Sequence, residues 1–94
     1  MNEFVRMELM RRGYSYRYHG TGYIEKAANA VIHAWGGHRP MLTKEVYPTI
    51  AKACNTSDMA VETAIRDAVR RVAPGRKPGA VIFEIAAVGK AHAD

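Results

Sequence analysis

Polar side chains recur along residues 58–71 at the spacing that places them on one face of a helix. An arginine on such a face can donate two parallel hydrogen bonds to the edge of a guanine or to a phosphate group. Glu62 and Arg66 are also four positions apart, which is the spacing of an ordinary surface ion pair, so the pattern alone leaves both interpretations open. The polar face consists of Glu62, Thr63, Arg66, Asp67, Arg70 and Arg71.

An apolar stripe on the opposite face predicts how this helix is held. It runs through Val61, Ile65, Ala68 and Val72 in steps of four, three and four, so it must be buried. Residues 56–58 are threonine, serine and aspartate, whose side-chain oxygens can cap the first free N–H groups of a helix. We therefore predict that the helix begins near residue 58.

A shorter helix is predicted just before it. Val46, Ile50, Ala51 and Cys54 form a second apolar stripe, and Pro48 is compatible with it only in or near the first turn, where an N–H has no partner anyway. The next residues must reverse the chain, and the asparagine at position 55 tolerates the left-handed conformation that ends a helix. Two helices joined so tightly are typical of a helix-turn-helix, which we predict for residues 43–72.

The arrangement also resembles the general helix-turn-helix pattern, with a small residue at Ala51, a turn residue at Asn55 and a buried aliphatic residue at Val61. This resemblance implies that the second helix enters the major groove of DNA. The positions that face DNA would be Ser57, Asp58, Met59, Glu62, Thr63 and Arg66.

The other segments are predicted to support this motif. Helices are expected at residues 2–12 and from about Gly22 to Trp35, with Trp35 as the largest single piece of the core. Residues 14–21 form an aromatic and basic connection, whose tyrosines are expected to pack on the core while Arg17 reaches a phosphate. The apolar run at 80–88 favours strand and helix equally.

The composition restricts the class of protein. A length of 94 residues with 48% hydrophobic content predicts one folded domain, residues 1–94. A formal net charge of +5 favours an anionic partner such as nucleic acid. The single cysteine cannot form an internal disulfide, and no apolar run is long enough to span a bilayer, so we expect a cytoplasmic protein.

Catalysis and metal binding are not predicted. The sequence has no Gly-rich phosphate loop, no paired carboxylates in a cleft and no nucleophile beside a base. His33, His38 and Cys54 match no common zinc spacing and lack a fourth ligand. We expect no enzymatic activity, no cofactor, no metal ion and no small-molecule ligand.

Several short blocks resemble one known family. They are the spacing of Gly13, Gly20 and Tyr23 with Ala27 after it, TK at 43–44, YP-x-IAK at 47–52, NT at 55–56 and VE-x-AIR-x-A at 61–68. Through them, residues 9–72 are similar to the DNA-binding C-terminal effector domain of the sporulation-initiation response regulator, stage zero sporulation protein A. KP at 77–78 followed by Phe83 matches the start of the family's final helix, which favours a helix at 80–88.

The resemblance implies an all-α domain, a compact bundle of about five helices, that binds a short operator on double-stranded DNA, often as adjacent copies. Glu62 and Arg66 match family residues that face the bases, whereas Thr63 stands where the family has an arginine. Because threonine cannot read guanine with two parallel hydrogen bonds, the operator is expected to differ.

Two further departures concern control and assembly. No phosphorylatable receiver domain precedes this one in the chain, so control by phosphorylation is not expected. The connection between Val72 and Pro78 is shorter than in the family, where it serves contacts between neighbouring copies, so self-association on adjacent DNA sites stays an open alternative.

We therefore predict a sequence-specific transcriptional regulator, in which Glu62, Thr63 and Arg66 read base edges. The alternative is a non-enzymatic protein-interaction module that kept the scaffold without specific DNA binding. The same reasoning does not decide whether Arg71 contacts a phosphate or is only solvated. Contacts to the DNA backbone are predicted for Arg17, Lys44, Lys52, Ser57 and Arg70.

Overall fold

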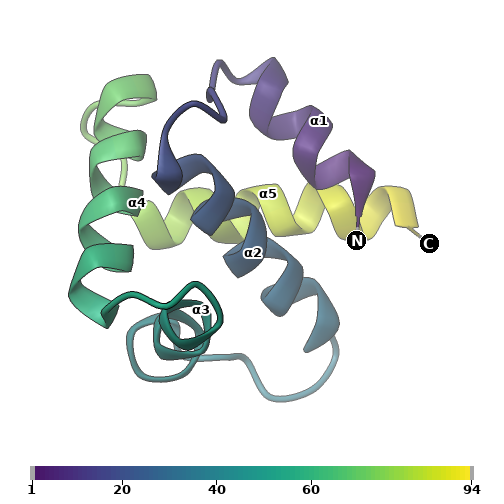
Figure 1. Cartoon of the computed structure of the whole chain (residues 1–94). Helices are drawn as coiled ribbons and strands as arrows, with labels where there is room; N and C mark the ends of the chain where they lie inside the picture. The colour runs from purple at the N-terminus through teal and green to yellow at the C-terminus, as the bar shows by residue number, and fades with distance from the viewer. Residues whose placement is uncertain (1, 94) are drawn as a thin grey trace.

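Five α-helices and one π-helical turn make up most of residues 2–93, the part of the chain that the computed structural model describes (Figure 1). No strand occurs among these residues, which confirms the predicted all-α bundle. The elements are α1 (Glu3–Arg11), α2 (His19–His33), the π-helical turn η1 (Leu42–Val46), α3 (Tyr47–Ala53), α4 (Asp58–Val72) and α5 (Pro78–Ala93).

Helix α2 runs through the middle of the molecule and contacts every other element (Figure 1). Helix α3 packs on α4 at one end of the bundle, while α1 packs on α5 at the other. The two helices that were predicted as a helix-turn-helix are therefore joined to the rest of the fold mainly through α2.

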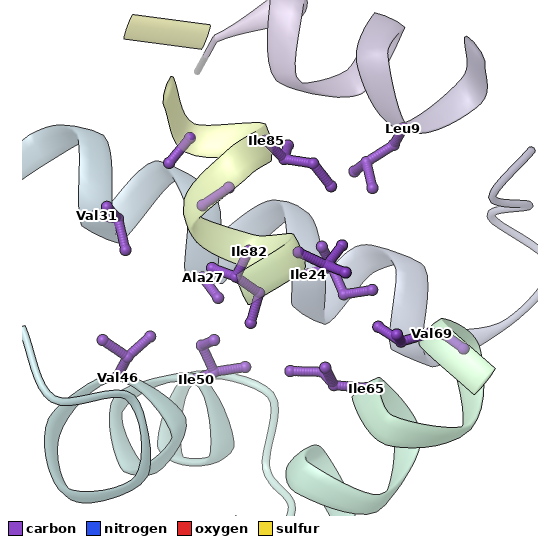
Figure 2. Packing of buried hydrophobic residues seen from close by; sticks show 14 of the residues in the cluster. Leu9, Ile24, Ala27, Val31, Val46, Ile50, Ile65, Val69, Ile82 and Ile85 are labelled. Carbon is purple, nitrogen blue, oxygen red and sulfur yellow. The ribbon is translucent and has the colours of Figure 1, made fainter. Parts of the chain in front are cut away.

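The core collects one apolar stripe from each helix. Figure 2 shows side chains from all of the elements pointing into the same space, and the isoleucines at 24, 65, 82 and 85 are fully buried there. Burying one such side chain contributes about 1.5–3 kcal/mol relative to leaving it exposed. The labelled side chains are Leu9, Ile24, Ala27, Val31, Val46, Ile50, Ile65, Val69, Ile82 and Ile85.

The ambiguous run at 80–88 is helical, as the resemblance favoured. Its buried residues are Val81, Ile82, Ile85 and Ala86, which lie on one face of a helix and do not alternate as they would in a strand. The β-branched residues are tolerated because this face packs against both α1 and α2.

The prediction that Trp35 is the largest piece of the core is wrong, because this side chain is 45% exposed. Helix α2 ends at His33, and the Trp35 N–H donates to the Ile32 carbonyl at 3.0 Å, which is a tight turn in place of another helical turn. The indole therefore leaves the buried stripe. It lines a surface cavity of about 320 Å³ together with Pro40 and Phe83.

The predicted start of this helix at Gly22 is also wrong, since α2 begins at His19. Tyr18 occupies the cap position without a side-chain hydrogen bond, so neither Thr21 nor Gly22 caps the helix. The Thr21 hydroxyl instead donates to the Ser15 carbonyl at 2.7 Å and holds the connection before α2.

The prediction that the tyrosines of the connection at residues 14–21 pack on the core is correct for only one of the three. Tyr14 is buried, whereas Tyr16 and Tyr18 are each 39% exposed. The Tyr16 hydroxyl donates to the buried Glu25 carboxylate at 2.6 Å, and Tyr18 faces an arginine of α4. The two exposed rings therefore have polar partners.

Helices α2 and α4 approach each other closely at Gly20. A Cβ atom at this position would lie 2.1 Å from the Ala64 carbonyl oxygen and 2.8 Å from the Ala68 Cβ atom. Both neighbours are rigid, because one is backbone and the other is the first atom of a side chain. Only glycine therefore allows the two helices to pack at this distance.

We expect Gly20→Ala to lower the free energy of unfolding by about 2 kcal/mol or more, since the clash forces α2 away from α4. Gly22→Ala is the matched control, because a Cβ atom there meets nothing within 4 Å. Alanine should stabilise α2 at that position by about 0.5–1 kcal/mol. Urea unfolding of both variants checks this, and equal midpoints would contradict the packing described here.

A network of charged side chains ties the end of α1 to α5. The buried Glu8 carboxylate accepts hydrogen bonds from Arg11 at 2.7 and 2.9 Å and from Arg12 at 2.7 Å. Arg12 also pairs with Glu84 of α5 at 3.1 Å, and Glu84 pairs with Arg76. The hydrogen bonds from Arg11 lower the pKa of Glu8 to about 2, against the opposing effect of burial.

We expect the stability that the ionised Glu8 contributes to be complete above about pH 4.5 and to disappear as the pH falls toward 2, because its pKa is lower in the folded protein than in the unfolded chain. Glu8→Gln should therefore lower the free energy of unfolding by about 2 kcal/mol at pH 7 and by less at pH 3. Unfolding curves at both values test this, with the exposed Glu3→Gln as control. A difference that does not change with pH would contradict it.

Candidate nucleic-acid interface

The turn between α3 and α4 is built by backbone hydrogen bonds. The Thr56 N–H donates to the Ala51 carbonyl at 2.9 Å, and the Asn55 N–H donates to the Lys52 carbonyl at 3.4 Å. These two hydrogen bonds form a Schellman motif, in which the first residue after the helix end, here residue 55, adopts the left-handed conformation. Asn55 has a φ of 56°, as its type predicted, so the chain reverses within a few residues.

Helix α4 begins where the sequence predicted, at Asp58. The Ser57 hydroxyl oxygen accepts a hydrogen bond from the Ala60 N–H at 3.1 Å and so caps the helix. Asp58 lies in the first turn, where a negative charge interacts favourably with the helix dipole. The Ser57 hydroxyl proton is not used by this cap and can still be donated to another group.

A π-helical turn precedes α3. The Tyr47 N–H donates to the Leu42 carbonyl, five residues back, and so does the Val46 N–H to the Met41 carbonyl at 3.2 Å. Pro48 follows at the start of α3, where the sequence placed it. This wider turn brings Lys44 onto the outside of the helix-turn-helix, where its side chain is exposed.

One face of α4 is free of the other elements. The buried residues are Val61, Ile65, Ala68 and Val69, and on the opposite side Met59, Thr63, Arg66 and Arg70 form a ridge with the exposed Asp67 beside it. Met59 is 76% exposed, Arg66 and Arg70 are exposed, and Thr63 is half-buried. Figure 1 shows α4 at one edge of the molecule, so this ridge points away from the bundle.

Two elements lie on either side of the ridge. Helix α3 packs on one flank of α4, and the charge of the exposed Glu62 adds to burial in raising the pKa of Tyr47 on α3, which places Glu62 on this flank. The connection before α2 lies on the other flank, because Gly20 touches Ala64 and Ala68.

The cations predicted to contact DNA are exposed side chains of the helix-turn-helix and of the connection before α2. Lys52 is exposed on α3, Lys44 on η1, and Arg17 in the connection before α2. Ser57 is exposed at the turn. The elements that carry these residues are far apart in the sequence, and their contact with DNA stays a prediction.

A comparison with protein families decides what this arrangement is similar to. Residues 5–82 match the family described as the sporulation initiation factor Spo0A C terminal. The match covers most of the chain. The chain belongs to this family.

The Spo0A C-terminal family consists of DNA-binding domains of sporulation regulators and is not a family of enzymes. Membership confirms the resemblance that the short blocks indicated, and the helix-turn-helix of the structure is consistent with it. Searches of curated proteins and of solved structures gave no significant match.

Within residues 2–93, His, Cys, Asp and Glu side chains do not gather in groups of three or more that could hold a metal ion. None of the helices described is both long and apolar enough to cross a bilayer.

Charge pairing separates two sets of arginines in this member of the Spo0A C-terminal family. Arg11, Arg12 and Arg76 are all paired with Glu8 or Glu84. In contrast, residues 2–93 contain no ion pair that involves Arg66, including the pair with Glu62 that the spacing of four would allow. The same holds for Arg17, Lys44, Lys52, Arg70 and Arg71.

One contact at the site has no signal in the sequence. The Arg71 guanidinium lies 3.8 Å from the centre of the Tyr18 ring, a cation–π contact between α4 and the connection before α2. The spacing of Arg71 on α4 shows only that it is exposed, and the residues are brought together by the close approach of α2 at Gly20.

We expect Ser57→Ala to lower the free energy of unfolding by about 1 kcal/mol, because the Ala60 N–H loses its partner. Ser57→Asp should restore most of this, since aspartate caps equally well. Arg66→Ala should change stability by less than about 0.5 kcal/mol, as an exposed side chain without an ion pair. Thermal unfolding of the three variants checks this, and a large loss for Arg66→Ala would show that this side chain supports the fold.

Proposed function

We propose that this protein binds specific sequences of double-stranded DNA through its helix-turn-helix and acts as a transcriptional regulator in the cytoplasm. The observation that carries the proposal is the free ridge of α4, which protrudes beside the turn in a chain of a DNA-binding family. The whole of residues 1–94 serves as one non-enzymatic DNA-binding domain.

Base readout is assigned to Glu62, Thr63 and Arg66. Arg66 lies on the ridge without a carboxylate partner in residues 2–93, so both of its parallel N–H groups are available for the O6 and N7 atoms of a guanine. Glu62 can accept a hydrogen bond from the amino group of a cytosine. Thr63 offers a hydroxyl and a methyl group, which suit a thymine or a water-mediated contact. The preferred operator would therefore differ from one that is read by an arginine at this position.

Backbone contacts are assigned to the residues around the ridge. The major groove is about 12 Å wide and a helix with its side chains is about 10–12 Å across, so phosphates lie along both flanks of an inserted helix. Lys44 and Lys52 would face one strand and Arg17 the other, while Arg70 and Ser57 reach phosphates near the two ends of α4. These contacts add affinity and salt dependence without specificity.

A protein-interaction module is the second candidate, and one observation favours it. The exposed Trp35 and the partly buried Phe83 line a surface cavity of about 320 Å³, and Met41 close by in the chain is 49% exposed. Exposed apolar groups of this size are typical of protein contacts. The run at 80–88 itself is less suited to such a role, because most of its apolar side chains are in the core.

We expect selection from random duplexes to enrich one family of sequences. Arg66→Ala should reduce the ratio of specific to random binding by about 10- to 100-fold, because a lost pair of parallel hydrogen bonds removes discrimination at one base. Weak, salt-sensitive binding should remain. Lys52→Ala is the control: it should weaken both kinds of binding equally and reduce the salt slope by about one.

The measurement is fluorescence anisotropy with the enriched duplex and with a scrambled one, at several salt concentrations. If the protein binds no duplex tightly at moderate salt, the protein-interaction alternative gains. If it binds but Arg66→Ala keeps the full preference, DNA binding stands and the assignment of Arg66 fails.

A further inference from the structure

Arg71 is held in place by an aromatic ring and has no carboxylate partner in residues 2–93. The guanidinium carbon lies over the Tyr18 ring, 3.8 Å from its centre, and a guanidinium that stacks on an aromatic ring uses its flat face for the contact. The N–H groups of a guanidinium lie in its plane. They therefore stay free to donate hydrogen bonds to an anion while the ring fixes the side chain.

The ring that holds Arg71 is itself fixed. The Tyr18 N–H donates to the Ser15 carbonyl at 3.2 Å, and the Thr21 N–H donates to the Tyr18 carbonyl at 3.2 Å. The Thr21 hydroxyl closes the same short connection at 2.7 Å, and Gly20 packs it directly on α4. Tyr18 is thus positioned by the same contact that joins α2 to α4.

Arg71 lies on the flank of α4 that α3 leaves open. At 100° per residue, Arg71 is turned about 80° from the ridge residue Thr63 in one direction, and Glu62 is turned about 100° in the other. Glu62 faces α3 through Tyr47. Arg71 is therefore on the opposite side, beside the connection that also carries the exposed Arg17.

The charge of α4 makes this flank important for an anionic ligand. The helix carries three acidic residues, at 58, 62 and 67, and three arginines, at 66, 70 and 71. Its formal charge is therefore zero, and its positive charge is confined to the C-terminal half. Arg71 lies in this half together with Arg66, Arg70 and the acidic Asp67, which gives the half a net charge of +2 and an attraction for a phosphate.

We propose that Arg71, aligned by the Tyr18 ring, binds a phosphodiester of the DNA strand that lies opposite the strand facing α3. A surface cavity of about 280 Å³ lies beside the guanidinium and has room for an oxygen atom of this phosphodiester. It is lined by Ser15, Tyr18, Ala68 and Arg71 among others. Tyr18 is a positioning residue, and it reduces the freedom that Arg71 would otherwise lose on binding. This inference rests on the proposed DNA binding and assigns a second anchoring point to it.

The test is fluorescence anisotropy of the full chain with a labelled 20-base-pair duplex of random sequence, at salt concentrations from about 50 to 200 mM, a range over which phosphate contacts change affinity strongly. Arg71→Ala should weaken binding about 5- to 10-fold at the lower salt and reduce the slope of log K against log salt by about one. Tyr18→Ala should weaken binding about 2- to 4-fold, because the charge remains but is no longer aligned. Tyr18→Phe keeps the ring face and should bind as the wild type does.

Arg11→Gln is the matched control for charge. It also removes one positive charge, but from α1, at a side chain already paired with Glu8. It should change the affinity by less than about 2-fold and leave the slope unchanged. Thermal unfolding of every variant sets a measurement temperature at which all are folded, so a loss of binding is not a loss of structure.

The outcomes separate this inference from the proposed function. If the wild type binds no duplex, both are overturned. If the wild type binds and Arg71→Ala behaves like Arg11→Gln, or Tyr18→Ala binds as tightly as Tyr18→Phe, only this inference is overturned. A random duplex is used so that the result does not depend on base readout by Arg66.

Discussion

The close approach of α2 to α4 at Gly20 is the contact on which the rest of the structure depends. The Ala64 carbonyl lies where any side chain at position 20 would have to stand, so the two helix backbones touch. This contact buries the apolar stripe of α4 against the central helix and turns the ridge of Thr63 and Arg66 outward. It also sets the connection before α2 against the flank of α4, where Tyr18 meets Arg71. One glycine therefore determines both the packing of the helix-turn-helix and the residues beside it.

The arginines differ in whether a carboxylate pairs with them. Glu8 and Glu84 pair with three arginines and join α1 to α5 and to the connection after α4. The arginines on α4 and in the connection before α2 have no such partners within residues 2–93. Ion pairs that are partly buried stabilise a fold, whereas a free guanidinium keeps its hydrogen-bonding capacity for a ligand.

The sequence predicted what depends on local rules. The cap at Ser57, the left-handed Asn55, the start of α4 and the buried stripe of Val61 and Ile65 all follow from residue type and helical spacing. The run at 80–88 could not be assigned from propensity, since its β-branched residues favour strand, and only the resemblance to a family favoured the helix that forms. Trp35 was misplaced because helix ends depend on tertiary contacts, and the chain turns just before it.

The candidate site was predictable only in part, for the same reason. Helical spacing shows that Arg66 and Arg70 are exposed, because exposure follows from the position of the buried stripe on the same helix. It cannot show what stands beside them. The pairing of Tyr18 with Arg71 and the facing of Glu62 toward Tyr47 join residues of different elements, so they require the packing of α2 and α3 on α4.

In the proposed mode of DNA binding, this packing would separate base readout from anchoring to phosphates, two tasks that a single recognition helix often combines. Since α4 has no net charge of its own, its attraction for a duplex must come largely from its C-terminal arginines and from the elements on its flanks. The ridge can then carry side chains such as Met59 and Thr63, which distinguish base edges by shape, methyl contacts and single hydrogen bonds and add little general affinity. The threonine at position 63 is tolerable in this proposed mode, because anchoring is assigned to Arg17, Arg71 and the lysines of α3 and η1. Changes at the ridge would alter which sequence is bound, and changes on the flanks would alter how tightly any sequence is bound.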